Sequence, residues 1–455
     1  MSSFKPAYGL AAIAVLSLLI AAPCGGGKGA PTTTVPSATP TALATPTPTP
    51  TVAPEVIDGV EVVPLQFGEE AELPDDVALI VETGCYYCDG PATGLYRVYR
   101  DVSGQLRTDA LFTVEALGLP PLGVNTSKEG TWVDEPYITG LALNDDASEI
   151  VAGVCTRGYC GGLGFPTADA QSTMYRSLDG GVTWEEFGVL DGESWVVAVV
   201  KAGVVVAGPY KENAQPKYRL FPSDDPVVPP PGASGWPLTV PNGDLAWRTD
   251  DGRLLRSDGS QVLALGDDAS LGDIVPDASG ERFAVAWWTN GPSPQHRVGL
   301  FSSDGHPISA FSLSDSVRVR GWLNDKLVAG NVSVPWELLP TPEPDSYAIT
   351  FLPAVFDVEA GIAHPLAGPF QELPLFGRNY IQAALHGPFA RVVNTGACLN
   401  VRSEPGTAVP VLACAADGVL LRDTGETRDA DGGTWIRVLT PAGVEGWAST
   451  QYLER

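Results

Sequence analysis

Cysteines are the residues whose spacing most clearly implies chemistry in this chain. There are seven, and six of them fall into three close pairs: Cys85 with Cys88, Cys155 with Cys160, and Cys398 with Cys414. Close pairs in an exported protein are typical of disulfides, because the compartment outside the cytoplasm is oxidising. Spacing alone leaves the pairing among the four cysteines between residues 85 and 160 open. Cys24 remains without a partner.

Two other uses of these cysteines compete with disulfides. Cys85 and Cys88 have the spacing of a redox motif, but they lie between two strand-like runs, whereas a reactive thiolate is stabilised at a helix N-terminus. Together with Cys155 and Cys160 they could also surround a zinc ion. We predict disulfides and no metal site.

Other catalytic patterns are missing from the sequence. The four histidines form no His-Glu-x-x-His motif, and no Gly-x-Ser-x-Gly nucleophile turn is present. The 54 acidic residues are too many for a catalytic pair to be chosen from spacing, because separation in space decides whether two carboxylates can cleave a glycosidic bond. The sequence therefore predicts no catalytic residue and no cofactor.

The charge of the chain limits its partners. The formal net charge is −27, and a surface this acidic repels the phosphate backbone of nucleic acids. We therefore expect no nucleic-acid partner.

The N-terminus indicates export. Lys5 precedes the uncharged apolar run 10–22, which is too short to cross about 30 Å of hydrocarbon but has the length of a signal sequence. Residues 1–24 resemble a bacterial lipoprotein signal, in which Cys24 would be lipidated. Pro23 departs from the small residue expected there, so release by ordinary signal peptidase is the alternative. We expect a protein anchored in the membrane by lipid, or an extracellular one.

Residues 25–58 are predicted to be a tether. Positions 31–54 hold seven prolines and nine threonines and no charged residue. Proline favours extended polyproline II, and too few large apolar side chains are present to form a core. The segment is expected to act as a spacer.

Residues 59–384 are predicted to form an all-β body. Short runs such as DVALIVET, EIVAGVC and RFAVAWW have strand length and strand composition, and acidic turns separate them. Similar strand–turn–strand segments begin at residues 175, 255, 300 and 355, and a four-stranded propeller blade takes about 40–50 residues. We predict a β-propeller of six or seven blades; a pair of β-sandwiches is the alternative.

One turn of this body carries a recognisable motif. Ser177, Asp179, Gly181, Thr183 and Trp184 resemble the Asp-box, S-x-D-x-G-x-T-W, of sialidase-like propellers. In that family the box stabilises a hairpin away from the reaction centre, so the resemblance implies fold and not activity. A sialidase also needs three arginines around a carboxylate, which spacing does not reveal here. Arginines and carboxylates clustered in the central funnel would favour an enzyme.

Residues 389–455 resemble a bacterial SH3-like domain over nearly their full length. The opening LNVRSEPGT starts at Leu399, a W-x-x-V follows at Trp435, and the closing G-W-x-x-x-x-Y-L includes Trp447. We expect a small β-barrel, stapled by Cys398 and Cys414, with Val411 among its inward side chains and a polar loop over 424–433. Trp435 and Trp447 are possible binding residues, although filling the core is an equal role for them.

Three functions follow from this organisation. The first is an envelope-anchored scaffold whose propeller binds a partner and whose SH3-like module binds cell-wall glycan or peptide, or an envelope protein. The second is a secreted hydrolase that cleaves glycans and is targeted by the module. The third is a sensor or assembly factor whose propeller binds another envelope protein.

Overall fold

The computed structural model describes residues 55–84, 94–101, 103–127, 130–144, 147–158, 160, 169–192, 194–208, 217–240, 244–265, 269–277, 279–290, 294–313, 316–333, 351–366 and 378–454. The predictions for the signal segment, for lipidation of Cys24, for most of the tether, and for Cys85 and Cys88 lie outside these residues. Throughout the described ranges the regular structure is strand, apart from the short 3-10 helices Glu115–Leu117 and Thr450–Tyr452. No helix in these ranges is long and apolar enough to cross a membrane.

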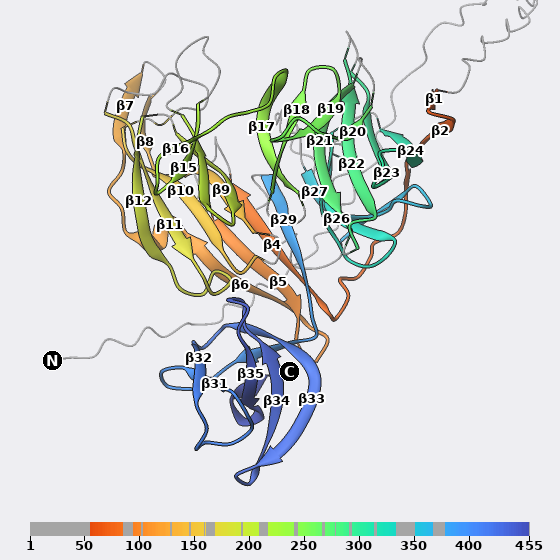
Figure 1. The fold of residues 1–455 in the computed structure, drawn as a ribbon. Coiled ribbons are helices and arrows are strands. Elements are labelled where there is room, and N and C mark those ends of the chain that lie inside the picture. Colours follow the sequence, from red (N-terminus) through yellow and green to blue (C-terminus); the bar gives the residue numbers. More distant parts are fainter. Residues whose placement is uncertain are drawn as a thin grey trace, which may run out of the picture. The chain divides into compact units, whose positions relative to one another are not determined.

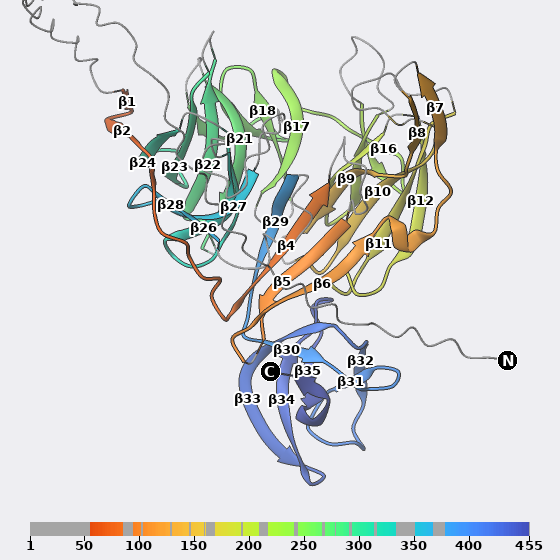
Figure 2. The same cartoon turned by 180° about the vertical axis from the view of Figure 1, so that it is seen from behind.

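Six β-sheets follow one another along the chain and form the blades of a propeller (Figures 1 and 2). Blade 2 contains β9 (Ile138–Leu143), β10 (Ile150–Arg157), β11 (Gln171–Ser177) and β12 (Glu185–Asp191). Blade 3 contains β13 (Trp195–Val200), β14 (Gly203–Ala207), β15 (Tyr218–Phe221) and β16 (Asp225–Val227). Blade 4 contains β17 (Ala233–Val240), β18 (Asp244–Thr249), β19 (Arg253–Arg256) and β20 (Gln261–Ala264).

The remaining blades complete the ring. Blade 5 contains β21 (Ala269–Pro276), β22 (Arg282–Thr289), β23 (His296–Ser302) and β24 (Pro307–Leu313), and blade 6 contains β25 (Val317–Trp322), β26 (Leu327–Ser333), β27 (Phe351–Asp357) and β28 (Ile362–Pro365). Blade 1 combines both ends of the propeller: β4 (Val77–Gly84), β5 (Gly94–Arg100) and β6 (Leu106–Thr113) pair onto β29 (Arg378–His386). This shared sheet ties the first blade to the last propeller strand. Between blades 1 and 2 the chain forms a hairpin of β7 (Gly123–Ser127) and β8 (Gly130–Asp134).

The core consists of apolar clusters between neighbouring blades. Leu95 and Phe112 of blade 1 pack with Ile150 and Val154 of blade 2, and five further clusters join the other pairs of blades around the ring. Both faces of a blade are thus covered, which explains why strands such as β4 are continuous apolar runs and do not alternate. The all-β propeller prediction is confirmed with six blades, and the β-sandwich alternative is wrong.

An N-terminal strap, residues 55–67, extends along the outside of two blades. Its strand β2 (Val60–Pro64) pairs in parallel with β24, its strand β3 (Gln66–Phe67) pairs in parallel with β28, and β1 (Val56–Ile57) adds to β2. Glu55 forms an ion pair with the buried Arg297, and Asp58 lies 2.9 Å from the His306 ring. The strap therefore covers edges of blades 5 and 6 that would otherwise be open.

A seven-stranded barrel follows the propeller. It contains β30 (Phe389–Val392), β31 (Leu399–Arg402), β32 (Val411–Ala415), β33 (Leu420–Ala430), β34 (Gly433–Leu439), β35 (Glu445–Ser449) and β36 (Leu453–Glu454). Val401, Ile436 and Val438 are fully buried in its core. Two expectations were wrong here. Val411 is 47% exposed because β32 is the edge strand, and most of the predicted loop 424–433 belongs to the hairpin of β33 and β34.

The barrel contacts the propeller directly. Two residues, Gly387 and Pro388, separate β29 from β30. Arg97 of β5 is buried and donates from Nη2 to the Gly418 carbonyl over 2.8 Å, and Asp109 of blade 1 pairs with Arg97 at 2.9 Å. Tyr99 and Leu420 meet in a small apolar cluster. Both views show the barrel beside β5 and β6 (Figures 1 and 2).

Candidate functional site

Two of the predicted cysteine pairs lie at disulfide distance. Cys155 of β10 and Cys160 have Cα atoms 5.8 Å apart, and both are buried. Cys398 and Cys414 have Cα atoms 5.5 Å apart and join the edge strand β32 to the start of β31. In the described part of the chain, no group of three or more His, Cys, Asp or Glu side chains is arranged to hold a metal ion.

The turn between β11 and β12 is held by the side chain of Asp179. Its carboxylate accepts hydrogen bonds from the Thr183 amide at 2.8 Å, the Thr183 hydroxyl at 2.6 Å and the Ser177 hydroxyl at 2.8 Å. Gly181 has a φ of 90°, which favours glycine, and Trp184 donates from Nε1 to the Leu111 carbonyl. These contacts describe a structural turn. Its membership of the Asp-box class stays a prediction.

The two tryptophans proposed as binding residues of the barrel are buried. Trp435 and Trp447 are each 5% exposed. Trp435 donates from Nε1 to the Ala430 carbonyl at 3.1 Å, and the Arg428 guanidinium lies 4.8 Å from the Trp447 ring. Neither ring presents a face to a ligand, so both fill the module.

The edge strand β32 is the more accessible apolar surface of the barrel. Val411 and Leu412 are 47% and 48% exposed, and β32 pairs on one side only, with β31. An edge strand offers unpaired backbone donors and acceptors to an incoming chain. This exposure could not be predicted from the sequence, because β32 has the apolar pattern of a core strand.

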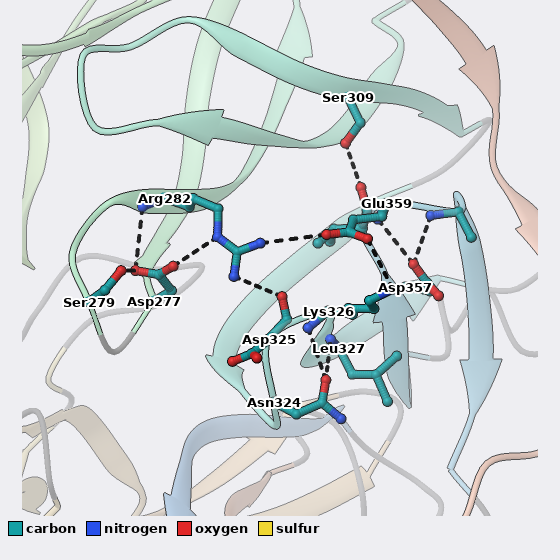
Figure 3. Close-up of polar contacts among 12 residues, drawn as sticks. Asp277, Ser279, Arg282, Ser309, Asn324, Asp325, Lys326, Leu327, Asp357 and Glu359 are labelled. Atoms are coloured by element: carbon teal, nitrogen blue, oxygen red, sulfur yellow. Dashed lines mark hydrogen bonds and ion pairs between the residues drawn. The ribbon is translucent and has the colours of Figure 1, made fainter.

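A polar network joins the turns of blades 5 and 6 (Figure 3). Arg282 contacts the Asp277 carboxylate at 2.9 Å, the Glu359 carboxylate at 3.6 Å and the Asp325 carbonyl at 2.8 Å. Lys326 adds a second cation at 3.4 Å from Glu359. The charges of this network are satisfied within the protein, which indicates a role in holding the two blades together.

A second charged group lies near the propeller axis and differs from this network. We call it the axial charge cluster; its members come from four successive blades and are Arg248 of β18, Asp273 of β21, Arg318 and Arg320 of β25, and Glu82 of β4. Arg320 approaches Asp273 to 3.3 Å between Nη1 and Oδ1. Asp273 is 7% exposed, whereas Arg318 is exposed to solvent.

Bulges position several of these side chains. Along β25 the pairing register shifts between Val319 and Gly321, which makes Arg320 the extra residue. Along β21 the register shifts between Leu271 and Ile274, so that Asp273 lies within the irregularity. A bulge re-aims the extra side chain away from the regular pleat, and bulges are frequent next to functional sites.

Blade 1 adds a polar residue in the same way. The register of β29 shifts at Gln382, whose Nε2 donates to the Glu82 carboxylate over 2.5 Å. Burial raises the pKa of Glu82, although this hydrogen bond and the charges of Arg320 and Arg318 act in the opposite direction. Glu82 therefore holds its proton more readily than an exposed glutamate does.

The surroundings of Arg248 lower its pKa. Burial lowers its pKa, the charge of Asp273 opposes this effect, and Arg320 and Arg318 lower the pKa further. Within the described residues the Arg248 side chain has no ion pair and no hydrogen bond, and its Nε is buried without an acceptor. The other arginines there whose Nε is buried in this way each form an ion pair.

Sequence reasoning missed the axial charge cluster. Its one visible signal is the segment VRVRGW at 317–322, where two arginines alternate with buried valines in a strand. In a propeller such a pattern on an innermost strand directs charge toward the axis. The sequence alone did not identify that strand as innermost.

The comparisons with known proteins identify the module but not the whole chain. Residues 397–454 match the bacterial SH3 domain family, so the C-terminal barrel is a bacterial SH3 domain. No curated protein matches the sequence.

Several solved structures resemble the fold weakly. TolB from Acinetobacter baumannii is 12% identical with a TM-score of 0.38, over 69% of this chain and 67% of that one. Oligogalacturonate lyase from Vibrio parahaemolyticus is 10% identical with a TM-score of 0.27, over 69% and 86%. Prolyl oligopeptidase B from Galerina marginata is 10% identical with a TM-score of 0.31, over 80% and 56%. Likenesses at this level assign no activity.

Proposed function

We propose that this protein is an exported scaffold of the bacterial cell envelope. In this proposal the signal segment directs export, Cys24 carries a lipid that anchors the chain in the membrane, and the tether spaces the folded body from it. Release as a soluble extracellular protein is the alternative that follows from Pro23. The propeller binds a partner, and the SH3 domain binds cell-wall glycan or peptide, or an envelope protein.

The observation that carries the proposal is the direct attachment of a bacterial SH3 domain to a closed propeller. Propellers and SH3 folds both serve as binding platforms, and function has to be argued from a site. The SH3 domain offers such a site at β32, where Val411 and Leu412 are exposed on an open sheet edge. A contact with an extended peptide or a glycan strand would use this edge.

A sedimentation assay with purified cell-wall sacculi tests this proposal. The full chain is expected to sediment with sacculi, and Val411→Asp is expected to weaken that binding at least tenfold, because it places a charge on the proposed contact. Val228→Asp is the matched control, since Val228 is an exposed valine of the propeller. If Val411→Asp binds sacculi as well as the wild-type chain does, the β32 edge is not the contact surface. If the wild-type chain does not bind sacculi, the proposed attachment to the cell wall is wrong.

One observation favours the second candidate function, a glycan-cleaving hydrolase. Arginines and carboxylates gather near the propeller axis, and two of the carboxyls lie in different environments. Asp273 is paired with Arg320, whereas the pKa of Glu82 is raised by burial. Glycoside hydrolysis uses two carboxyls, one as an acid and the other as a base or nucleophile. Hydrolysis of a glycan substrate that is lost in Asp273→Asn would support this function over pure binding.

A further inference from the structure

The turn between β11 and β12 makes contacts beyond its own hairpin. Its residue Val182 packs against the hydrophobic core of the SH3 domain, although it belongs to blade 2 of the propeller. A Cβ atom placed on Gly418, in the loop after β32, would lie 3.9 Å from Val182 Cγ1. A Cβ atom placed on Gly180 of the same turn would lie 3.7 Å from the Pro441 ring, in the loop after β34. One turn of the propeller therefore reaches two loops of the SH3 domain.

Hydrogen bonds within the propeller fix the position of Val182. The Asp179 carboxylate accepts the Val182 amide at 3.1 Å, and it also accepts the amide and the hydroxyl of Thr183. Trp184 donates from Nε1 to the Leu111 carbonyl of blade 1 at 2.7 Å, which ties the turn to the neighbouring blade. A side chain that is already held in place loses less conformational entropy when it makes a contact. The turn thus presents Val182 to the SH3 domain in a preorganised position.

The two large aliphatic side chains of the turn have different surroundings. Leu178 is 46% exposed, whereas Val182 is half-buried against the SH3 core. Gly180, between them, is buried. The turn therefore has one side that faces water and another that faces the SH3 domain, so the contribution of each side can be tested separately.

Blade 1 meets the same part of the SH3 domain. Arg97 donates from Nη2 to the Gly418 carbonyl at 2.8 Å, so this glycine is contacted both by Arg97 of blade 1 and by Val182 of blade 2. The Asp109 carboxylate of blade 1 lies 3.6 Å from Nε of Arg391 in β30. The SH3 domain therefore contacts both blades at the seam between them.

We propose that the turn over residues 177–184 is a docking site for the SH3 domain, in which Val182 completes the hydrophobic core of that domain. Domains joined by a linker move relative to each other unless a well-packed apolar interface holds them together. Here the apolar contact of Val182 and the Arg97 hydrogen bond hold the SH3 domain in one orientation on the seam of blades 1 and 2. Gly418 follows the end of β32 by three residues, so the same contact fixes the direction of the exposed β32 edge.

Amide hydrogen exchange of the full chain tests the proposal. Val182→Asp places a charge against the SH3 core, and it is expected to speed exchange in β31 and β34 at least about fivefold. Exchange in the propeller strands β4 and β10 is expected to stay at the wild-type rate. Leu178→Asp is the matched control, because it introduces the same charge on the exposed side of the same turn, and it is expected to change neither set of strands. No ligand is added, so this experiment succeeds or fails independently of the sacculus assay.

A milder substitution covers the case in which Val182→Asp does not fold. Val182→Thr keeps the shape of the side chain and replaces a methyl group by a hydroxyl, so it should speed exchange in β31 and β34 to a smaller extent. NMR relaxation on the same proteins should show the SH3 domain tumbling with the propeller in the wild type and in Leu178→Asp. In Val182→Asp the SH3 domain should tumble faster than the propeller.

Several results would overturn the proposal. Unchanged exchange in β31 and β34 in both Val182 variants would show that this side chain does not complete the SH3 core. An equal effect of Leu178→Asp, or an equal acceleration in β4 and β10, would show that the substitutions only destabilise the turn or the propeller. An SH3 domain that tumbles independently in the wild-type chain would show that it is not docked.

Discussion

Single aspartate side chains stabilise several turns of this protein by accepting hydrogen bonds. Asp179 holds one hairpin of the propeller, and Asp431 holds a turn of the SH3 domain by accepting the Thr407 amide at 2.6 Å and the Thr407 hydroxyl at 2.7 Å. Part of the strong acidity of the chain is thus structural. An aspartate accepts backbone N–H groups that a turn leaves without partners.

Replacing Asp179 tests whether an aspartate side chain stabilises the turn that it occupies. Asp179→Ala is expected to lower the free energy of unfolding by about 1–3 kcal/mol, because two backbone amides and two hydroxyls lose their acceptor. Urea denaturation measures the change. Asp225→Ala is the control, since Asp225 is exposed and its side chain has no hydrogen bond in the described ranges; an equal loss in both variants would contradict the role of Asp179.

Acid should weaken the turn at Asp431. The hydrogen bonds from Thr407 lower the pKa of Asp431 below that of the unfolded chain, near 3.9. A lowered pKa in the folded state adds stability above about pH 4, and this stability is lost as the pH falls through the folded pKa. We expect a loss of stability below about pH 4 that is shallower in Asp431→Asn.

Thermal melting across this pH range measures the effect. Glu404→Gln is the matched control, because Glu404 is exposed in the same domain and accepts no hydrogen bond in the described ranges. An acid slope that is the same in wild type and in Asp431→Asn would show that this carboxylate does not contribute to it.

At the scale of strands, the strap is the element that joins the start of the described chain to the propeller. It is short, it pairs in parallel at the outer edges of blades 5 and 6, and its first described residue, Glu55, forms an ion pair with Arg297. Arg297 is 1% exposed and is therefore costly to leave without a partner. We call this contact the clamp, because it holds the first described residue of the strap to the propeller.

Removing the clamp should loosen the strap and leave the blades intact. Glu55→Gln is expected to lower the local opening free energy of the strap by about 1–3 kcal/mol, which speeds amide hydrogen exchange over residues 60–67 roughly fivefold or more. Hydrogen exchange with mass spectrometry measures this. Glu61→Gln is the control within the same strap, because Glu61 is exposed; faster exchange in that variant too would point to a general loss of stability.

At the scale of the whole molecule, the propeller and the SH3 domain share an interface. The two-residue connection after β29, the Arg97 hydrogen bond to Gly418 and the contact of Tyr99 with Leu420 join them. Burial raises the pKa of Tyr99 to about 12, helped by the charge of Asp109. Because β29 also closes the ring, the SH3 domain is attached to the strand on which closure depends.

We expect the two parts to unfold together. Arg97→Met should remove about 1–3 kcal/mol of coupling, since it deletes a buried ion pair and a hydrogen bond across the interface. Differential scanning calorimetry should then show two transitions in place of one. Arg107→Met, a surface arginine of the same blade, should keep one transition; two transitions in the wild-type chain would refute the coupling.

The sequence by itself determined the composition of the strands and the identity of the C-terminal module. Apolar runs such as ALIV in β4 and the LNVRSEPGT segment are local signals, and local signals are sufficient to predict strands, turns and a small domain. Turn residues such as Asp179 were visible for the same reason. They act on amides within a few residues of themselves in the chain.

The tertiary structure decided the number of blades, the closure through β29 and the axial charge cluster. Each of these features depends on contacts between residues far apart in the chain. The direction of the Arg320 side chain depends on a β-bulge, which the hydrophobic pattern of the sequence does not predict. Val411 was predicted to face the core for a related reason. Its strand, β32, is the edge strand of the sheet, and the sequence does not show which strand lies at the edge. Side-chain direction follows from pairing register, and pairing register is set by the whole fold.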